Sequence, residues 1–200
     1  MIKNIVFDFG DIFINLDKQA PFREMAKFGL TQMTPALDQF AKSYEMGLVE
    51  SADFLREMQA LFPNATQERI KAAWNSIILD FPAYRLDFIE ALKKEDTYRL
   101  FLLSNTNDLH IQQVKESMGM EHYQRFQNCF ERFYLSHEIK MRKPNADIYE
   151  FVLEENGLHP KESFFIDDTK ENTDSAAALG IRVWNLQVGS QDIIELKTHL

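Results

Sequence analysis

Residues 2–11 have the sequence Ile2-Lys3-Asn4-Ile5-Val6-Phe7-Asp8-Phe9-Gly10-Asp11. The apolar run in this segment is too short for a helix, and it ends at a carboxylate. Its hydrophobicity is nearly continuous rather than alternating, which is typical of a strand that helices cover on both faces. Residues 98–103 and 163–166 show the same pattern and also end in polar residues. The three runs predict a buried parallel sheet.

Helical patterns separate these runs along the chain. Helices predicted over 108–118, 145–156 and 170–179 each end just before a glycine, a residue that takes the left-handed backbone conformation at no steric cost. Weaker strands are predicted over 133–135 and 181–186. Strands that alternate with helices indicate an α/β fold with a doubly wound parallel sheet. Such sheets bind ligands beyond the carboxyl ends of their strands.

The segment from residue 18 to residue 81 contains only helical patterns. Apolar residues recur there at spacings of three and four, and helices are predicted over 21–28, 35–46, 52–61 and 67–78. A further helix over 84–94 leads back to the sheet. We therefore predict a core domain made of residues 1–17 and 82–200, with residues 18–81 inserted as an all-helical cap domain.

Length, charge and cysteine content restrict the function classes. The 200 residues suffice for one domain with a smaller insertion. The net charge of −9 opposes broad contact with nucleic acid or an anionic membrane. Cys129 is the single cysteine, so we expect a reducing compartment. Without a pattern typical of a signal peptide or a spanning helix, we expect a cytoplasmic protein that is a monomer or a weak homodimer.

Polar side chains follow each of the three strong strands. Asp8 follows the first, where a carboxylate can coordinate a hard cation or attack an electrophile, although a simple turn residue fits equally well. Ser104 and Asn105 follow the second, directly ahead of a helix. Hydroxyl, amide and free helical N–H groups together make a seat for an anion, and capping of the helix by Asn107 or Asp108 is compatible with this.

Asp167 and Asp168 follow the third strong strand. Together with Asp8 they would repel one another in a crevice, because like charges about 4 Å apart cost several kcal/mol. A divalent cation resolves this, and ligands that are all oxygen atoms favour Mg²⁺. Taken alone, the pair would be interpreted as two solvated turn residues. Lys143, just before Pro144, offers a cation for a bound anion or a carboxylate, although a lysine in a loop is commonly solvated.

These four segments, in this order, resemble the haloacid dehalogenase-like (HAD) superfamily over essentially the whole chain. The superfamily has an aspartate nucleophile after its first strand, a Ser or Thr after its second, a lysine and a pair of acids. A closer resemblance is to the bacterial sugar-phosphate phosphatase branch that contains α-D-glucose-1-phosphate phosphatases. The residues that carry it are Leu103-Ser104-Asn105-Thr106-Asn107 with Leu109-His110, Met141-Arg142-Lys143-Pro144, and Phe165-Ile166-Asp167-Asp168 with Asn172 and Leu179-Gly180.

The resemblance implies a Rossmann-like core, a helical cap and a set of roles. The insert lies where that branch has its cap, and Tyr44-Glu45-Met46-Gly47 resembles the turn that faces the substrate, which implies that Glu45 binds substrate. The implied catalytic residues are Asp8 as the nucleophile that forms an aspartyl-phosphate, Ser104, and Lys143 as the charge-balancing cation. Ser104, the Asn105 amide and Lys143 would bind the phosphoryl group, and Mg²⁺ would be held by Asp8, the Gly10 carbonyl and Asp168, with Asp167 behind them or acting through water.

One position departs from the pattern of most phosphatases in this superfamily. They carry a second aspartate two residues after the nucleophile as general acid and base, and this chain has Gly10 there. Loss of such a group typically reduces turnover by about 10²–10⁴-fold. The branch that this chain resembles also tends to have glycine at that place. Asp11 lies one residue further along the chain, and the sequence assigns it no role.

The leading functional hypothesis is a Mg²⁺-dependent phosphatase that hydrolyses a small phosphorylated metabolite, such as a sugar phosphate, through an aspartyl-phosphate. Two alternatives stay open at this point. A metal-independent 2-haloacid dehalogenase would also lack the second aspartate, although a site without metal has little reason to gather Asp167 and Asp168. A non-catalytic module that binds a phosphorylated ligand would account for Gly10.

Overall fold

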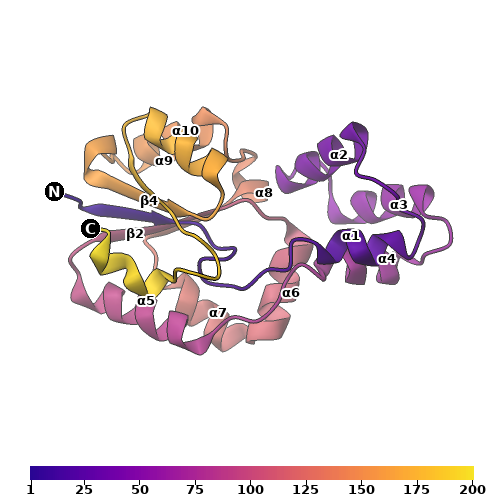
Figure 1. Cartoon of the computed structure of the whole chain (residues 1–200), viewed down its shortest axis with the longest axis horizontal. Coiled ribbons are helices and arrows are strands. Elements are labelled where there is room, and N and C mark those ends of the chain that lie inside the picture. The colour runs from indigo at the N-terminus through magenta and orange to yellow at the C-terminus, as the bar shows by residue number, and fades with distance from the viewer.

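A five-stranded parallel sheet forms the centre of the larger part of the molecule (Figure 1). The computed structural model describes all of residues 1–200, and it confirms the predicted α/β fold class. The strands lie in the order β3-β2-β1-β4-β5, and each neighbouring pair is parallel. They comprise β1 (Asn4–Phe7), β2 (Arg99–Ser104), β3 (Arg132–Leu135), β4 (Ser163–Asp167) and β5 (Arg182–Asn185).

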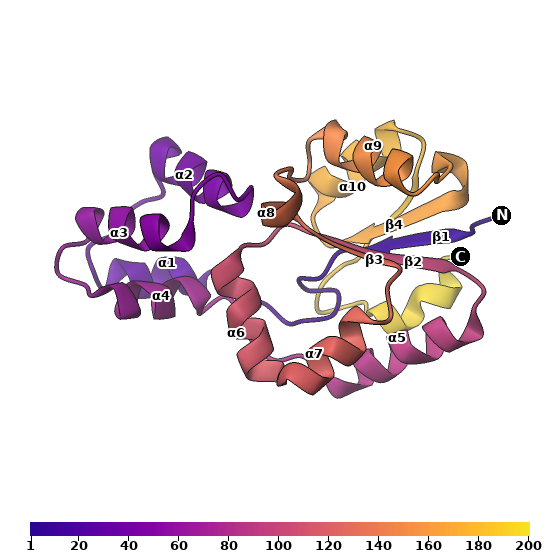
Figure 2. The same ribbon diagram turned by 180° about the vertical axis from the view of Figure 1, so that it is seen from behind.

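Helices cover both faces of this sheet (Figure 2). In β1, Ile5 and Phe7 face one layer while Val6 faces the other, and all are buried. This two-sided burial accounts for the nearly continuous hydrophobicity of the strand. One face packs against α5 (Ala83–Glu95), α6 (Asp108–Met118) and α7 (Met120–Gln127), and the other packs against α9 (Ala146–Glu155) and α10 (Lys170–Ala178).

Several short helices of the structure are not among those predicted from the sequence. Helix α6 ends before Gly119 as predicted, but α7 begins directly after this glycine, where no second helix is predicted. Helix α8 (Ser136–Ile139) is a single turn, and η1 (Pro160–Glu162) and η2 (Ile193–Thr198) are 3₁₀ helices. No element is predicted over residues 187–200. In the structure, the side chain of Asp192 caps η2 by accepting the Ile194 N–H at 3.2 Å.

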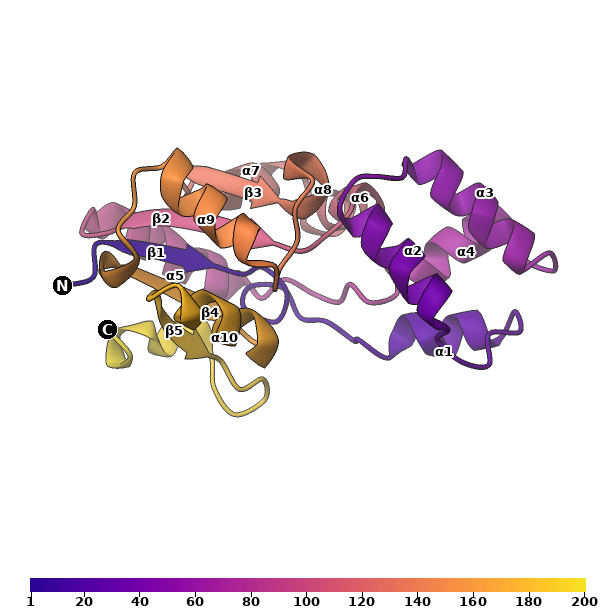
Figure 3. The same ribbon diagram turned by 90° about the horizontal axis from the view of Figure 1, so that it is seen from above.

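The insertion forms a separate bundle of four helices beside the sheet (Figure 3). These are α1 (Ala20–Ala26), α2 (Pro35–Glu45), α3 (Ser51–Leu61) and α4 (Gln67–Asn75). Phe54 lies at the centre of the bundle and stacks on Tyr44 with ring centroids 4.1 Å apart. We call this bundle the cap below. In Figure 1 the carboxyl ends of the strands point toward it.

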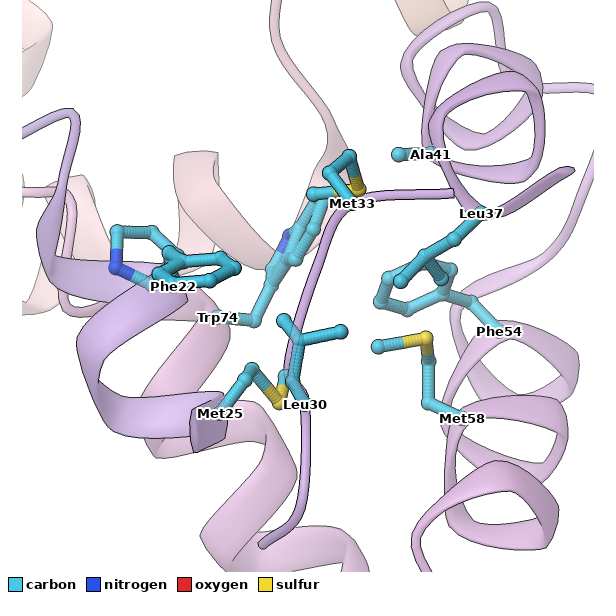
Figure 4. A pocket seen from close by; sticks show the side chains of 10 residues that line it. Phe22, Met25, Leu30, Met33, Leu37, Ala41, Phe54, Met58 and Trp74 are labelled. Carbon is cyan, nitrogen blue, oxygen red and sulfur yellow. The ribbon is translucent and has the colours of Figure 1, made fainter. Parts of the chain in front are cut away.

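A small apolar cavity lies inside the cap (Figure 4). Its volume is about 30 Å³, and nine of its ten lining residues are hydrophobic, among them Met25, Met33 and Met58. A cavity of this size holds at most a water molecule, which would find almost no polar partner there. We interpret it as a packing gap between flexible methionine side chains rather than as a binding site.

Two antiparallel passages of chain connect the cap to the sheet. Leu16 in the outgoing passage forms a β-bridge with Ile78 in the returning one, and Asp17 N–H donates to the Ile77 carbonyl at 2.9 Å. The predicted helix over 67–78 therefore ends earlier, at Asn75, because the next residues pair with the other passage. This pairing positions the cap over the carboxyl ends of the strands.

Candidate active site

Lys143 lies at the centre of a buried charge cluster at the carboxyl edge of the sheet. Its ammonium group donates to Asp8 Oδ1, Asp167 Oδ2 and the Leu103 carbonyl, each at 2.7 Å. The side chain is only 1% exposed. The alternative of a solvated loop lysine is therefore wrong, and three strand ends meet on one cation.

The side chain of Asn105 holds the loop that carries Lys143. Its Nδ2 donates to the Lys143 carbonyl at 2.8 Å, and its Oδ1 accepts the Lys143 N–H at 2.9 Å. The Lys143–Pro144 peptide bond is cis. Of the two amide groups of Asn105, only the backbone N–H is left to bind a ligand, because the side-chain amide is occupied by this loop.

Burial and charge act against each other in this cluster. Burial disfavours the ammonium form of Lys143, but Asp167 and Asp8 outweigh it and raise the pKa of Lys143, which therefore stays charged. Burial also raises the pKa of the Asp8 carboxyl, and the nearby Lys143 opposes this shift. A further cation beside Asp8 would favour its ionised, nucleophilic form.

Three aspartates gather around this point. Carboxylate oxygens of Asp8, Asp167 and Asp168 all lie within 4.8 Å of one another. Asp167 uses both of its oxygens inside the protein, since it also accepts bonds from the Thr169 N–H at 2.8 Å and from Asn172 Nδ2. Asp8 Oδ2, Asp168 Oδ1 and the Gly10 carbonyl accept no hydrogen bond within the protein. These three oxygens are the ones available to a cation.

Lys18 and Asp11 join the cluster from the outgoing passage. The Lys18 ammonium group bonds to Asp168 and lies 2.9 Å from Asp11 Oδ2. Asp11, whose φ is 56°, also accepts the Leu16 N–H at 3.0 Å through its Oδ1. Its carboxylate is thus turned toward the linker. No pattern in the sequence distinguished Lys18, because a single lysine between two predicted elements carries no signal.

Gly10 is enclosed by this same linker. A Cβ atom built on Gly10 would lie 2.6 Å from Leu16 Cδ1, so a side chain there would require Leu16 to move. Leu16 itself packs against the main hydrophobic core. A second aspartate at position 10 would therefore have to displace the end of the Leu16 side chain, and the carboxylate of Asp11 is turned away toward the linker.

Four hydrogen-bond donors at the carboxyl ends of β1 and β2 have no partner within the protein. The backbone N–H groups of Phe9, Gly10 and Asn105 and the hydroxyl of Ser104 donate no hydrogen bond within the protein. Ser104 is buried at the end of β2. Behind it, Asn107 caps α6 by accepting the His110 N–H at 3.0 Å, which settles the choice between Asn107 and Asp108. These four donors are available to an anion at this edge of the sheet.

Glu45 lies where the end of α2 meets α8. Its Oε2 accepts a hydrogen bond from Arg142 at 3.1 Å, so the residue before Lys143 reaches the cap. Burial raises the pKa of Glu45, and Arg142 opposes the shift. Arg142 belongs to the segment Met141-Arg142-Lys143-Pro144 that carries the resemblance, but the sequence assigned it no role of its own.

Comparison with known proteins identifies the family. Residues 5–186 match the family model described as haloacid dehalogenase-like hydrolase. The chain belongs to this family. The resemblance to the HAD superfamily inferred from the motifs is thereby confirmed, and the chain is a HAD hydrolase.

The proteins similar to this HAD hydrolase include one that is named as a phosphatase. It is 27% identical over 196 residues to the D-ribitol-5-phosphate phosphatase of Bacteroides thetaiotaomicron, covering 95% of this chain and 94% of that protein. A HAD family enzyme from the same organism, crystallised as an aspartate-to-alanine mutant with magnesium and inorganic phosphate, is similar with a TM-score of 0.80, 35% identity and 96% of both chains covered. A HAD-like hydrolase from Porphyromonas gingivalis has a TM-score of 0.83 and 28% identity, with 99% of this chain and 97% of that chain covered.

The dehalogenases among the similar structures are more distant from this HAD hydrolase. The L-2-haloacid dehalogenase PA0810 has a TM-score of 0.57 and 18% identity, covering 92% of this chain and 83% of that one, which shows a shared fold only.

None of the helices in the structure has both the length and the apolar character needed to cross a membrane.

Proposed function

We propose that this HAD hydrolase is a Mg²⁺-dependent phosphatase that hydrolyses a small phosphorylated metabolite, and that its substrate is a sugar phosphate or a closely related polyol phosphate. The observation that carries the proposal is that the buried Asp8 carboxylate pairs with Lys143 at the same sheet edge where N–H and hydroxyl donors of β1 and β2 are unbonded within the protein. The names of the relatives support the choice of a phosphate ester as substrate.

The residues present fit a divalent cation. Four carboxylates, those of Asp8, Asp11, Asp167 and Asp168, contact only two ammonium groups, those of Lys18 and Lys143. Two negative charges remain when all six groups are ionised, and the free oxygens are hard ligands of the kind that Mg²⁺ prefers. Asp8, Asp168 and the Gly10 carbonyl would hold the ion, while Asp167 orients Lys143.

The chemistry follows from the positions of these side chains. Asp8 attacks phosphorus through the carboxylate oxygen that does not hold the ion, the ester P–O bond breaks, and an aspartyl-phosphate forms. Ser104 and the free N–H groups bind the phosphoryl oxygens, and Lys143 balances their charge. Bound Mg²⁺ would supply further positive charge to the phosphoryl group. Water then hydrolyses the aspartyl-phosphate, which releases phosphate and restores Asp8.

No carboxylic acid is present at position 10 to protonate the leaving group. Asp11 is held by Leu16 and Lys18, so the leaving oxygen takes its proton from water. We therefore propose that turnover is slower than in phosphatases with the second aspartate, by up to about 10²–10⁴-fold. Glu45 and Arg142, which join the cap to the loop of Lys143, would face the part of the substrate beyond the phosphate.

The test is phosphate release from a panel of sugar, sugar-alcohol and other small phosphate esters, with Mg²⁺ and with EDTA. We expect release that requires the metal and that falls by more than roughly 10³-fold in Asp8→Asn. Asp147→Asn, an exposed aspartate on α9, is the matched control and keeps full activity. Equal release in EDTA, or an active Asp8→Asn variant, would overturn the proposal.

The same preparation separates the two other functions. Metal-independent halide release from 2-haloacids would identify a dehalogenase. Thermal stabilisation by phosphorylated ligands without turnover of any ester would identify a binding module. We expect neither, because the carboxylates beyond Asp8 have a role only where a cation and a phosphoryl group are bound together.

A further inference from the structure

The cap contacts the core on the same loop that carries the phosphate donors. Directly after Ser104 and Asn105, the next residues of this loop are held by the cap. Asn107 Oδ1 accepts the indole N–H of Trp74 at 3.4 Å, and Leu109 N–H donates to the Tyr44 hydroxyl at 3.2 Å. The position of the cap and the position of the phosphate seat are therefore linked through a few residues.

Ser136 lies at the centre of this contact. It begins α8, and its side chain is fully buried. Its Oγ accepts the Thr106 N–H at 2.9 Å. The same Oγ lies 2.6 Å from the Glu45 carbonyl of the cap and 2.9 Å from the Thr106 carbonyl of the loop. Thr106 directly follows Asn105, so one hydroxyl touches both the cap and the phosphate-binding loop.

A hydroxyl has one proton, so Ser136 can donate to only one of these two carbonyls at a time. The shorter distance favours Glu45 in the docked cap. No other hydrogen bond to the Glu45 carbonyl is present, so turning the hydroxyl away would leave that oxygen buried and unpaired. With the cap moved away, water can reach the Glu45 carbonyl, and the hydroxyl is free to donate to Thr106.

The neighbouring backbone contact fits the same arrangement. A Cβ atom on Gly47 would lie 2.0 Å from the His137 carbonyl, so the cap turn meets α8 backbone to backbone. Glu45 and Ser136 are brought to hydrogen-bond distance by this close approach. The backbone contact at Gly47 and the hydrogen bond at Ser136 therefore both hold the cap turn against α8.

We propose that Ser136 is a positioning residue that couples docking of the cap to the geometry of the phosphate-binding loop, by exchanging its single donated hydrogen bond between the Glu45 carbonyl and the Thr106 carbonyl. This inference rests on the proposed phosphatase function. It predicts that an anion bound beside Ser104 and Asn105 stabilises the docked cap, and that a docked cap improves anion binding by the same factor.

Hydrogen exchange of the full-length protein, measured by mass spectrometry with and without inorganic phosphate and Mg²⁺, tests the coupling. In the wild type we expect phosphate to slow exchange both in the loop, residues 104–110, and in the cap turn, residues 44–50. Protection of the loop alone in the wild type would overturn the inference, whatever the variants do.

Three variants assign the coupling to the hydroxyl. In Ser136→Ala we expect phosphate still to protect residues 104–110 but no longer residues 44–50, and KM for the preferred ester to rise roughly three- to tenfold, the equivalent of one hydrogen bond. Ser136→Thr, which keeps a hydroxyl, should restore joint protection. Ser163→Ala is the matched control, because Ser163 is equally buried and donates to the His159 carbonyl at 2.9 Å at the opposite end of the sheet.

The outcomes separate this inference from the proposed function. Ser136→Ala that retains protection of both segments and has the KM of Ser163→Ala would overturn the role of Ser136 while phosphatase activity stands. No phosphate release from any ester, with no protection by phosphate in the wild type, would overturn the proposed function and this inference together.

Discussion

Lys143 is the residue on which the charge balance of the site depends. Its ammonium group lies between Asp8 and Asp167, both buried. Removing one partner of a buried ion pair costs about 3–5 kcal/mol, because the other charge is left without compensation. We expect Lys143→Met to lose stability in this range, as measured by urea denaturation, and to lose phosphate release by at least roughly 10²-fold.

Lys161→Met is the control for this substitution, since Lys161 is exposed on η1. It should unfold at the same urea concentration as the wild type. A Lys143→Met protein as stable as Lys161→Met would show that Asp8 and Asp167 do not need a buried cation, and it would contradict the arrangement of charges described above.

His110 gives the molecule a pH dependence that is separate from the buried charge cluster around Lys143. Its Nε2 faces the Trp74 carbonyl at 3.2 Å, and its Nδ1 lies 3.0 Å from Asn107 Nδ2. Because Asn107 Oδ1 already accepts the His110 N–H, its Nδ2 donates to Nδ1, which must therefore be unprotonated. Burial lowers the pKa of His110 to about 4, and the neighbouring His137 adds to this shift, while the Trp74 carbonyl opposes it.

The unfolded chain binds a proton at this histidine below about pH 6.5, whereas the folded protein does not until about pH 4. Stability from His110 is therefore complete at pH 7 and is lost as the pH falls from 6.5 toward 4. Between pH 7 and pH 5 we expect the free energy of unfolding to fall by about 2 kcal/mol more in the wild type than in His110→Gln. Urea denaturation at both pH values measures this, and equal decreases in the two proteins would show that His110 is not held neutral.

At the scale of elements, Gly47 controls how closely α2 approaches α8. It has a φ of +63°, and an added Cβ would lie 2.0 Å from the His137 carbonyl, a backbone atom that cannot easily move. Gly157 has nearly the same φ, +61°, but nothing lies within 4 Å of its Cβ position. The two glycines thus differ in crowding and not in backbone conformation.

We expect Gly157→Ala to lose only the conformational term, about 1–2 kcal/mol, and to keep its activity. Gly47→Ala should lose a similar amount and in addition lose activity by roughly tenfold or more, because the cap turn can no longer reach α8. Thermal unfolding together with phosphate release checks both variants. Similar activity in the two would show that the close approach at Gly47 is not needed for turnover.

At the scale of the whole molecule, the acidic cluster links metal binding to folding. The carboxylates that would hold Mg²⁺ come together only in the folded chain, so the ion stabilises the folded state. At 100 times its dissociation constant, a ligand of this kind adds about 2.7 kcal/mol. We expect Mg²⁺ to raise the melting temperature of the wild type and to have a much smaller effect on Asp168→Asn. A shift of equal size in both proteins would place the ion elsewhere.

The sequence contains enough local information for the sheet and most helices. The hydrophobic runs of β1, β2 and β4 and the glycines after α6, α9 and α10 act over a few residues, so they are visible without the fold. Helices α7 and α8 lacked such signals, because α7 follows its glycine without a gap and α8 has a single turn. The positions of Asp8, Ser104 and Asp168 at strand ends could also be predicted from the sequence, because each of these residues ends or directly follows its own hydrophobic strand.

What the sequence by itself determined is therefore the fold class and the chemical types that meet at one edge of the sheet. Only the tertiary structure decided which partners they have. Lys143 and Asp8 are 135 residues apart in the chain and Lys18 and Asp168 are 150 apart, yet both pairs are in contact. The orientation of Asp11, the crowding at Gly10 and the junction at Ser136 depend on such distant contacts, which packing determines and which no short-range pattern encodes.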